Sequence, residues 1–550
     1  MDNQRLLLYM AFGFVSLLVY QAWIQDYHMP PPATTQEVVQ PGTTAAVPGG
    51  EDLPSAVVPG TASVAQAPVI DKTIAAPLVK VKTDVMDIEI STNGATIVSV
   101  LLNDYPVSIE DQDTPFTLVS NTPERFLVAQ SGLFNGDGGN APVPTHEAVM
   151  KVEAESYELG DQASVSIPFV WTSEDGKTVT KTLTFSKGSY EVLVDYVIDN
   201  GSEAPWSVSQ YRQLKRKPDT KDEKQSFINT YIGAVVSTPE DRYNKVSFGD
   251  MEDEQLNETV TNGWVAMIQH YFATAWVPTP DEVNTAYTRY LPSENRYLVG
   301  MISAAQTIPA GGQGRFSTKA YIGPKIQENL AATAEHLELT VDFGWLTILA
   351  QPLFWLLKTI HGFVGNWGWS IILLTFVIKA LFYKLSEAGY RSMAKMKKLQ
   401  PKIQELKERY GDDRAKMGQA TMELYKKEKT NPLGGCFPIL IQMPVFIALY
   451  WTLLESVELR QAPWMFHIKD LAIRDPYFIL PVVMAVTMYI QQKISAPPLD
   501  PIQAKVFQFL PIIMGVFFAM FPAGLVLYWV INNTLTILQQ YYITKKVLAE

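Results

Sequence analysis

The 550-residue chain lacks the residues and motifs on which disulfide-stapled domains and most enzymes depend. Its one cysteine, Cys436, excludes a disulfide within the chain, so an exported domain would have to fold on its hydrophobic core alone. The six histidines are scattered, and residues 78–335 contain no phosphate-binding loop, GxSxG or HExxH motif. We therefore expect no cofactor, no metal and no enzyme activity.

Basic residues are scarce in one part of the chain. Residues 26–344 carry 42 acidic and 21 basic side chains, a local net charge of −21, whereas the whole chain carries −12. The remaining residues must therefore carry a net charge of +9. Because basic loops stay in the cytoplasm, this asymmetry predicts that residues 26–344 lie outside the cytoplasm, in the periplasm of a bacterial cell.

The amino terminus contains the first long hydrophobic run. Leu6 to Trp23 is free of charge and long enough to span a bilayer, and Arg5 precedes it. No small-x-small cleavage site follows closely, so residues 1–27 are predicted to be an uncleaved signal anchor with the terminus in the cytoplasm. Residues 28–77 are rich in Pro, Ala, Thr, Val and Gly, a composition typical of a flexible tether.

From Leu78 the hydrophobic pattern has a period of two residues. Residues 177–187 and 190–200 alternate in this way, and the turn sequence Glu174-Asp175-Gly176-Lys177 precedes the first of them. No sustained helical pattern interrupts such segments up to about Ile322. Residues 78–335 are therefore predicted to form a large antiparallel β-sandwich.

The charge pattern also predicts which of the remaining apolar segments cross the membrane. Residues 384–430 contain 13 Lys/Arg and 7 acidic residues and should be cytoplasmic. If both 345–364 and 367–383 crossed the membrane, this basic segment would lie outside. Residues 336–364 are therefore expected to form an amphipathic helix at the outer membrane surface. Five spans follow, at about 367–386, 433–454, 477–492, 505–521 and 523–541.

With the anchor, these spans make a polytopic protein of six transmembrane helices whose two termini are cytoplasmic. Residues 387–430 are predicted to form a cytoplasmic helical hairpin. Their apolar residues Met396, Leu399, Ile403 and Leu406 recur at coiled-coil spacing before a break at Gly411. Its basic faces are either solvated flanks of the spans or a docking surface for an anionic partner such as ribosomal RNA or lipid head groups.

Lys379 is a cation inside an otherwise apolar span. Such a charge near the bilayer centre costs roughly 2.5–3.5 kcal/mol on insertion scales and usually faces a polar cavity. The alternative is a lysine that snorkels to the membrane surface. No Asp or Glu lies within any predicted span to pair with it; the nearest acids, Glu387 and Glu455, lie near helix ends.

Polar residues on three spans could surround this cation. Thr375 shares its helix face at a spacing of four residues, and Gln442 lies between two prolines of the next span. One face of the last span contains four polar or aromatic residues: Trp529, Asn533, Thr536 and Gln540. We therefore expect a hydrophilic groove bordered by these helices, rather than hydrogen bonds that only hold helices together.

Three motifs carry a resemblance to a known family. They read SMAKMKKLQPKIQELKERYGDD, NPLGGCFPILIQMPVFIALYWTLLESVELRQAPW and FPAGLVLYWVINN. The chain resembles, over its whole length, the YidC family of membrane protein insertases, which is related to the mitochondrial Oxa and chloroplast Alb proteins. The large domain after the first span is similar to that of the Gram-negative members.

The resemblance implies an ATP-independent insertase and chaperone of the inner membrane. Its groove would hold one positive charge, at Lys379, and receive the polar or acidic tail of a nascent membrane protein. The hydrophobic segment would slide along the spans at 477–492 and 523–541, with Tyr528 and Trp529 as substrate-contacting aromatics. Implied partners are nascent membrane proteins, the Sec translocon with its accessory subunits, the ribosome or targeting machinery, and membrane lipids.

Two departures from the family pattern and two rival functions bear on this hypothesis. Members usually carry Arg where this chain has Lys379, and many end in a long basic tail, whereas this chain stops soon after Lys545-Lys546. The first rival is a secondary transporter or channel with Lys379 as an ion site, although the spans show no repeated halves and no buried acids. The second is an outer enzyme or sugar-binding domain that is merely anchored.

Overall fold

The computed structural model describes residues 52–53, 76–139, 141–218, 230–410, 413–428, 437–495 and 501–549. The chain divides into two compact units, Met1–Gly49 and Gly50–Glu550, and every described residue belongs to the second. The predicted anchor at 1–27, most of the predicted tether at 28–77, and Cys436 lie outside the described residues.

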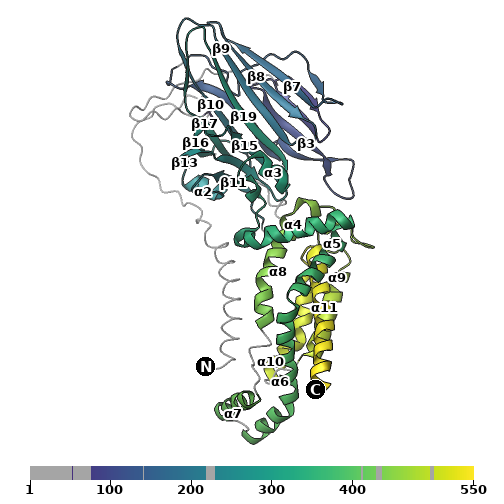
Figure 1. The fold of residues 1–550 in the computed structure, drawn as a ribbon. Coiled ribbons are helices and arrows are strands. Elements are labelled where there is room, and N and C mark those ends of the chain that lie inside the picture. The colour runs from purple at the N-terminus through teal and green to yellow at the C-terminus, as the bar shows by residue number, and fades with distance from the viewer. Residues whose placement is uncertain are drawn as a thin grey trace. The chain divides into compact units, whose positions relative to one another are not determined.

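The alternating segments form two stacked β-sheets, as predicted (Figure 1). The first sheet contains eleven strands within the described ranges: β1 (Leu78–Lys82), β2 (Met86–Ser91), β3 (Thr96–Pro106), β4 (Pro115–Asn121), β5 (Phe126–Asn135), β6 (Ser156–Glu158), β10 (Trp206–Arg216), β13 (Asn257–Thr261), β16 (Val283–Leu291), β17 (Arg296–Ser303) and β18 (Gln306–Ile308). The second contains eight: β7 (Ser164–Thr172), β8 (Lys177–Ser186), β9 (Glu191–Asn200), β11 (Gly233–Ser237), β12 (Asn244–Val246), β14 (Trp264–Ile268), β15 (Phe272–Pro278) and β19 (Gln313–Pro324).

The strand pairing is antiparallel with one exception. Only β1 and β6 run parallel among the pairs that the described residues form. In most strands alternate residues point into the core, as in β8, where Val179, Leu183 and Phe185 are buried between half-exposed neighbours. The antiparallel sandwich predicted from the period-two pattern is thus present.

Strand β10 departs from this alternation. From Val208 to Arg216 every residue is buried, including the charged side chains of Arg212, Lys215 and Arg216. Buried charges are costly unless they are paired, so this strand must carry a network of polar contacts.

Helices follow the sandwich, and two short ones lie within or just after it. Their bounds are α2 (Phe248–Asp253), α3 (Gln327–Thr333), α4 (Thr347–Val364), α5 (Trp367–Leu381), α6 (Tyr383–Tyr410), α7 (Arg414–Lys427), α8 (Phe437–Glu455), α9 (Ile479–Ile494), α10 (Pro501–Phe518) and α11 (Ala523–Ala549). The hairpin predicted over 387–430 corresponds to most of α6 and to α7, with Asp413 capping α7 by accepting from the Lys416 N–H at 3.1 Å.

The helix predicted over 367–386 is broken, which corrects that prediction. Phe382 separates α5 from α6, and the two helices are bent by 68°. No Gly or Pro marks the break in the sequence, and α5 and α6 both pack against α11. Within the described ranges no helix is by itself long and apolar enough to cross a membrane, but this bent pair meets the criterion when taken together. The count of six spans stays a prediction.

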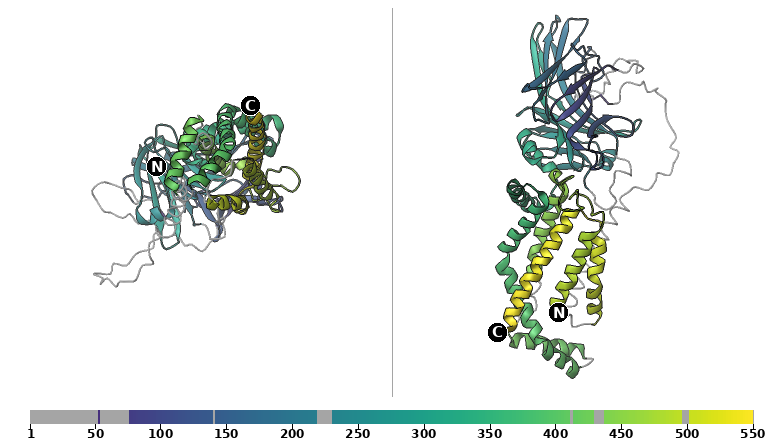
Figure 2. Two further views of the ribbon diagram at one scale, coloured as in Figure 1. Left: turned by 90° about the horizontal axis from the view of Figure 1, so that it is seen from below. Right: turned by 90° about the vertical axis from the view of Figure 1, so that its right-hand side faces the viewer.

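The helices pack around α11, which contacts α5, α6, α8 and α9. Helices α9 and α10, drawn in yellow-green, lie side by side in Figure 2. Their outward faces are apolar, with Val482 on α9 and Phe509, Ile512 and Val516 on α10 all exposed by more than half. Such a continuous apolar surface is typical of a surface that contacts lipid or another protein.

Helix α4 is apolar on two faces. Ala350, Phe354 and Leu357 are buried against α5 and α8, whereas Ile348 and Trp355 are exposed. An exposed face of this composition is consistent with a helix that lies at a membrane surface. The helix predicted over 336–364 is shorter than expected, because residues 337–340 and 344–346 form only short 3-10 turns before α4 begins at Thr347.

A buried ion pair joins the sandwich to the helices. Lys325, just after β19, lies 3.1 Å from the carboxylate of Glu455 at the end of α8, and both side chains are almost fully buried. Beside it the His270 Nε2–H donates to the Leu454 carbonyl at 2.9 Å, and burial lowers the pKa of His270 to about 3, so this imidazole is neutral.

Candidate functional site around Lys379

Lys379 lies in the last turn of α5 and points toward α11. Its side chain is buried, and its Nζ donates a hydrogen bond to the Thr536 hydroxyl at 2.7 Å. The Thr536 hydroxyl in turn donates to the Asn532 carbonyl, also at 2.7 Å. The ammonium is therefore held by the neighbouring helix rather than extended along its own, which is the geometry expected of a cation that faces an interior.

Within the described part of the chain, no acid pairs with Lys379. The two acids that directly follow predicted spans are engaged elsewhere, since Glu387 pairs with Arg391 at 3.0 Å and Glu455 with Lys325. A hydroxyl oxygen partly solvates an ammonium but does not neutralise it. The site therefore has a net positive charge, and the ammonium can donate further hydrogen bonds to an anionic or strongly polar group.

Thr375 is placed as predicted but bonded differently. Its side chain is almost fully buried on α5, one turn before Lys379. Its hydroxyl donates to the Ile371 carbonyl of the same helix at 2.7 Å, a common arrangement for threonine in a helix. The hydroxyl hydrogen of Thr375 is thus already donated, and this hydroxyl can only accept a hydrogen bond from a further partner.

Gln442 of α8 contacts α11 through Asn532 rather than through Asn533. Its amide donates to Asn532 Oδ1 at 2.7 Å, and the Tyr528 hydroxyl hydrogen-bonds to Gln442 as well. Asn532 is a residue that the sequence analysis missed. The signal was present, because Asn532 and Thr536 are four residues apart on one face of α11.

The two predicted substrate-contacting aromatics occupy different surroundings. Tyr528 is almost fully buried, with its ring 6.2 Å from that of Phe446 on α8. The Trp529 ring lies 4.8 Å from Phe446 and 5.4 Å from Phe518, between α8 and the end of α10. Both aromatics therefore line the contact between α11 and α8, and Trp529 also reaches α10.

Three buried polar atoms on α11 have no hydrogen-bond partner among the described residues. They are Trp529 Nε1, Asn533 Nδ2 and Gln540 Oε1. Leaving such a group unpaired costs about 1–3 kcal/mol, so each needs a partner other than the described residues, such as water or a bound polar chain. The structure thus places Lys379, Thr536 and Gln442 at α11, the helix that also carries these three unpaired polar atoms.

Comparisons with known proteins identify the two halves of the chain. Residues 78–356 match the family described as YidC periplasmic domain, and residues 359–550 match the 60Kd inner membrane protein family. The chain is 48% identical over 565 residues to the membrane protein insertase YidC of Thioalkalivibrio sulfidiphilus, covering 100% of this chain and 99% of that protein. It is 48% identical over 558 residues to the membrane protein insertase YidC of Nitrosococcus oceani, covering 100% of both.

Among solved structures, a YidC insertase crystal structure with its first transmembrane domain resolved matches with 16% identity over 85% of this chain and 95% of that one. Its TM-score of 0.38 is too low to support a conclusion. The sequence relatives and family matches are sufficient, because they extend over the sandwich and the helices alike. On that basis, the chain belongs to the YidC family, in the form that carries the periplasmic β-sandwich domain.

Proposed function

We propose that this chain inserts nascent proteins into the bacterial inner membrane, and that they pass through a polar groove between α5, α8 and α11. The curated relatives that match its full length are named membrane protein insertases. The observation that carries the groove is the Lys379 ammonium, which is buried, bonded to the Thr536 hydroxyl, and without an acid partner in the described structure.

The groove lowers the barrier to insertion in two ways. Its cation attracts the carboxylates of a tail that must cross the membrane. Without such a partner, these carboxylates would lose their hydration at a high cost in free energy. The unpaired polar atoms of Trp529, Asn533 and Gln540 offer hydrogen bonds to a polar chain or to the water that accompanies it. Neither step requires a nucleotide or a covalent intermediate.

The outer helix faces accept the hydrophobic part of the substrate. Leu373, Phe376 and Leu381 on α5 are exposed, as is much of α9. A hydrophobic segment that leaves the groove would contact these side chains and then lipid. The same proposal includes cytoplasmic termini, the α6–α7 hairpin as the site of substrate capture, and the Sec translocon, the ribosome and lipids as partners.

Crosslinking to a stalled nascent chain tests this proposal. A photoreactive phenylalanine analogue at Trp529 keeps Lys379 intact, and a second probe, a photoreactive lysine analogue at position 379, keeps the ammonium group in place. A matched control probe at Ile348 is exposed on α4, away from the groove. We expect adducts at 529 and 379 and few at 348. Repeated failure at both groove positions, or solute flux in proteoliposomes without any insertion, would contradict the proposal and favour a transporter.

A further inference from the structure

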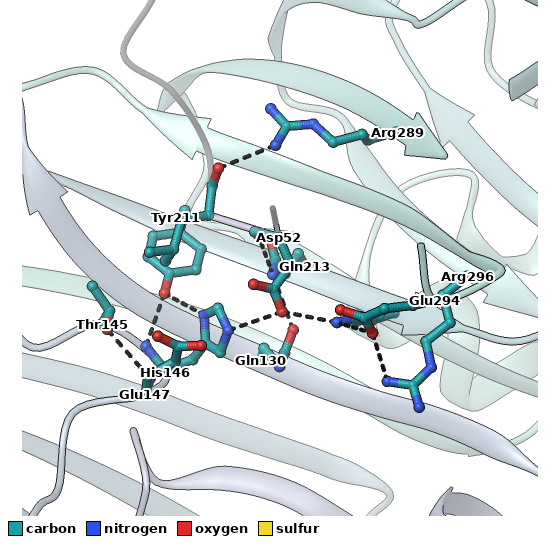
Figure 3. Close-up of polar contacts among 12 residues, drawn as sticks. Asp52, Gln130, Thr145, His146, Glu147, Tyr211, Gln213, Arg289, Glu294 and Arg296 are labelled. Atoms are coloured by element: carbon teal, nitrogen blue, oxygen red, sulfur yellow. Dashed lines mark hydrogen bonds and ion pairs between the residues drawn. The ribbon is translucent and has the colours of Figure 1, made fainter. Parts of the chain in front are cut away.

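A second cluster of buried charges lies on the 11-stranded sheet, far along the chain from Lys379 (Figure 3). Its centre is Asp52, a residue of the predicted tether, which is buried. The Asp52 carboxylate lies 2.8 Å from Lys215 Nζ on β10 and 3.4 Å from His146 Nε2. Burial alone would raise the pKa of Asp52, but His146 and Lys215 hold it well below its usual range.

The main chain of the tether is bound as well. The Gln213 amide donates to the Asp52 carbonyl at 3.1 Å, and the Arg289 guanidinium donates to the Leu53 carbonyl at 3.1 Å. Figure 3 shows these side chains converging on the segment from strands that are distant in the sequence. Asp52 and Leu53 thus contribute one carboxylate and two carbonyls to these contacts.

The side chains that bind this segment are held by other residues of the sandwich. Lys215 is also 2.8 Å from Glu294, and the Gln213 amide donates to Gln130 Oε1 at 2.9 Å. The Tyr287 hydroxyl donates to Gln213 Oε1 at 2.7 Å. A set of buried donors fixed in this way by a rigid sheet is a preorganised site rather than a chance contact.

The orientation of His146 supports the same conclusion. The Tyr211 hydroxyl accepts from the His146 backbone N–H at 2.8 Å and lies 2.6 Å from His146 Nδ1. With Nδ1 held against Tyr211, the Nε2 atom faces the Asp52 carboxylate at 3.4 Å. His146 is thus a buried imidazole aimed at the carboxylate position.

A metal ion is a poor occupant of this site. Asp52, His146 and Glu147 offer ligand atoms within 4.8 Å of one another. The Lys215 ammonium, however, already lies against the Asp52 carboxylate at hydrogen-bonding distance and repels a second cation. The chemistry of the donors, two cationic side chains with an amide and an imidazole N–H, fits an anion with main-chain carbonyls beside it.

We propose that this cluster is a binding site for an acidic peptide, and that Asp52-Leu53 of the chain itself is its resident ligand. Asp52 lies in a turn and Leu53 in a bend, and any segment that presents an aspartate in this way offers the same carboxylate and carbonyls. A peptide from another protein must therefore displace the tether, and the tether acts as a built-in competitor. This inference is independent of the groove at Lys379.

Fluorescence anisotropy with the full-length protein in detergent tests the site. The probe is a labelled peptide of residues 47–56, VPGGEDLPSA, and a control peptide carries Asn in place of its Asp. In Asp52→Asn protein the resident ligand is weakened while the site is unchanged. We expect this variant to bind the Asp peptide at least tenfold more tightly than the wild type does, and to bind the Asn peptide at least tenfold more weakly than the Asp peptide.

Equal affinity of wild type and Asp52→Asn for the Asp peptide would overturn the competition between tether and peptide. Equal affinity of the two peptides would overturn recognition of the carboxylate, and this comparison requires no change in the protein that could impair folding. Binding that appears only when a divalent cation is added would assign the cluster to a metal instead. Lys215→Met in the Asp52→Asn background should abolish peptide binding; retained binding would contradict the assignment.

Discussion

The Lys379 ammonium donates to the Thr536 hydroxyl at 2.7 Å although the two residues are 157 positions apart in the chain. Lys379 is the one charged residue of α5, and Thr536 lies on α11, the helix that contacts α5, α6, α8 and α9. This bond connects the single cation of the proposed groove to the centre of the helical region, and two predictions depend on it.

Lys379→Ala should reduce the insertion of substrates with acidic outer tails to background, because it removes the charge that attracts their carboxylates. Lys379→Arg should keep most of the activity, since the charge remains. Protease protection of a radiolabelled substrate in proteoliposomes measures both. Lys384→Ala, which removes an exposed lysine soon after α5, is the matched control and should insert normally. Full activity of Lys379→Ala would rule out a role for the charge.

Thr536→Val should impair insertion more than Thr375→Val does. Both substitutions replace a buried hydroxyl, which donates to a carbonyl of its own helix, by a methyl group of similar size, but only Thr536 also accepts from Lys379. Loss of the acceptor leaves the ammonium without its partner, at a cost of about 1–3 kcal/mol. Insertion rates and thermal unfolding of the two variants, compared side by side, measure the difference. Equal effects would show that the bond has no special importance.

The stability of the sandwich should depend on pH through Lys181. Its ammonium donates to the carbonyls of Gly94, Ala95 and Ser131 at 2.6–3.2 Å, and burial lowers its pKa to about 7. Between about pH 7 and the unfolded pKa of about 10.4, the unfolded state binds more protons, so the free energy of unfolding rises with pH.

The contribution of Lys181 amounts to at most ~1.4 kcal/mol per pH unit in this window, since one proton is involved. Hydrogen exchange of the β8 amides at pH 7 to 9, corrected for intrinsic rates, reports the opening free energy. Lys181→Met should remove the rise, although it lowers the stability at every pH. The same slope in both proteins would assign the pH dependence to another group.

Glu455→Gln should destabilise the protein by about 3–5 kcal/mol, because it leaves the buried Lys325 ammonium without its partner. Adding Lys325→Met should recover part of this loss, since no charge is then buried. Thermal unfolding of the full chain in detergent measures both. Glu405→Gln, at an exposed position of α6, is the control and should stay within about 0.5 kcal/mol of the wild type. A double variant no more stable than the single one would argue against an electrostatic cause.

The sandwich and the buried position of Lys379 were predictable from the sequence for different reasons. Alternation reveals a strand because one face of a sheet is buried, and Lys379 is conspicuous because its neighbours are apolar. Thr536 could be placed on the correct face of its helix from spacing alone. Asn532 was missed because adjacent residues lie about 100° apart on a helix, and spacing does not decide which of Asn532 and Asn533 faces a partner.

Contacts between distant segments leave no pattern in the sequence. Lys181 bonds to carbonyls 50 and 87 residues away, and Asp52 contacts β10 across 163 positions. Their side chains look like ordinary surface charges until the sheets form around them. The break at Phe382 was equally hidden, because no helix-breaking residue marks it in the sequence.

That break has an electrostatic consequence for Lys379. Aligned peptide dipoles give the carboxyl end of a helix a partial negative charge of about half an electron, which acts within the last turn. Because α5 ends at Leu381, where the chain bends by 68° into α6, Lys379 lies in the last helical turn of α5. A continuous helix would carry its negative end to Tyr410, far from the ammonium. The bend thus provides through the backbone about 0.3–1 kcal/mol of the stabilisation that no acidic side chain provides there.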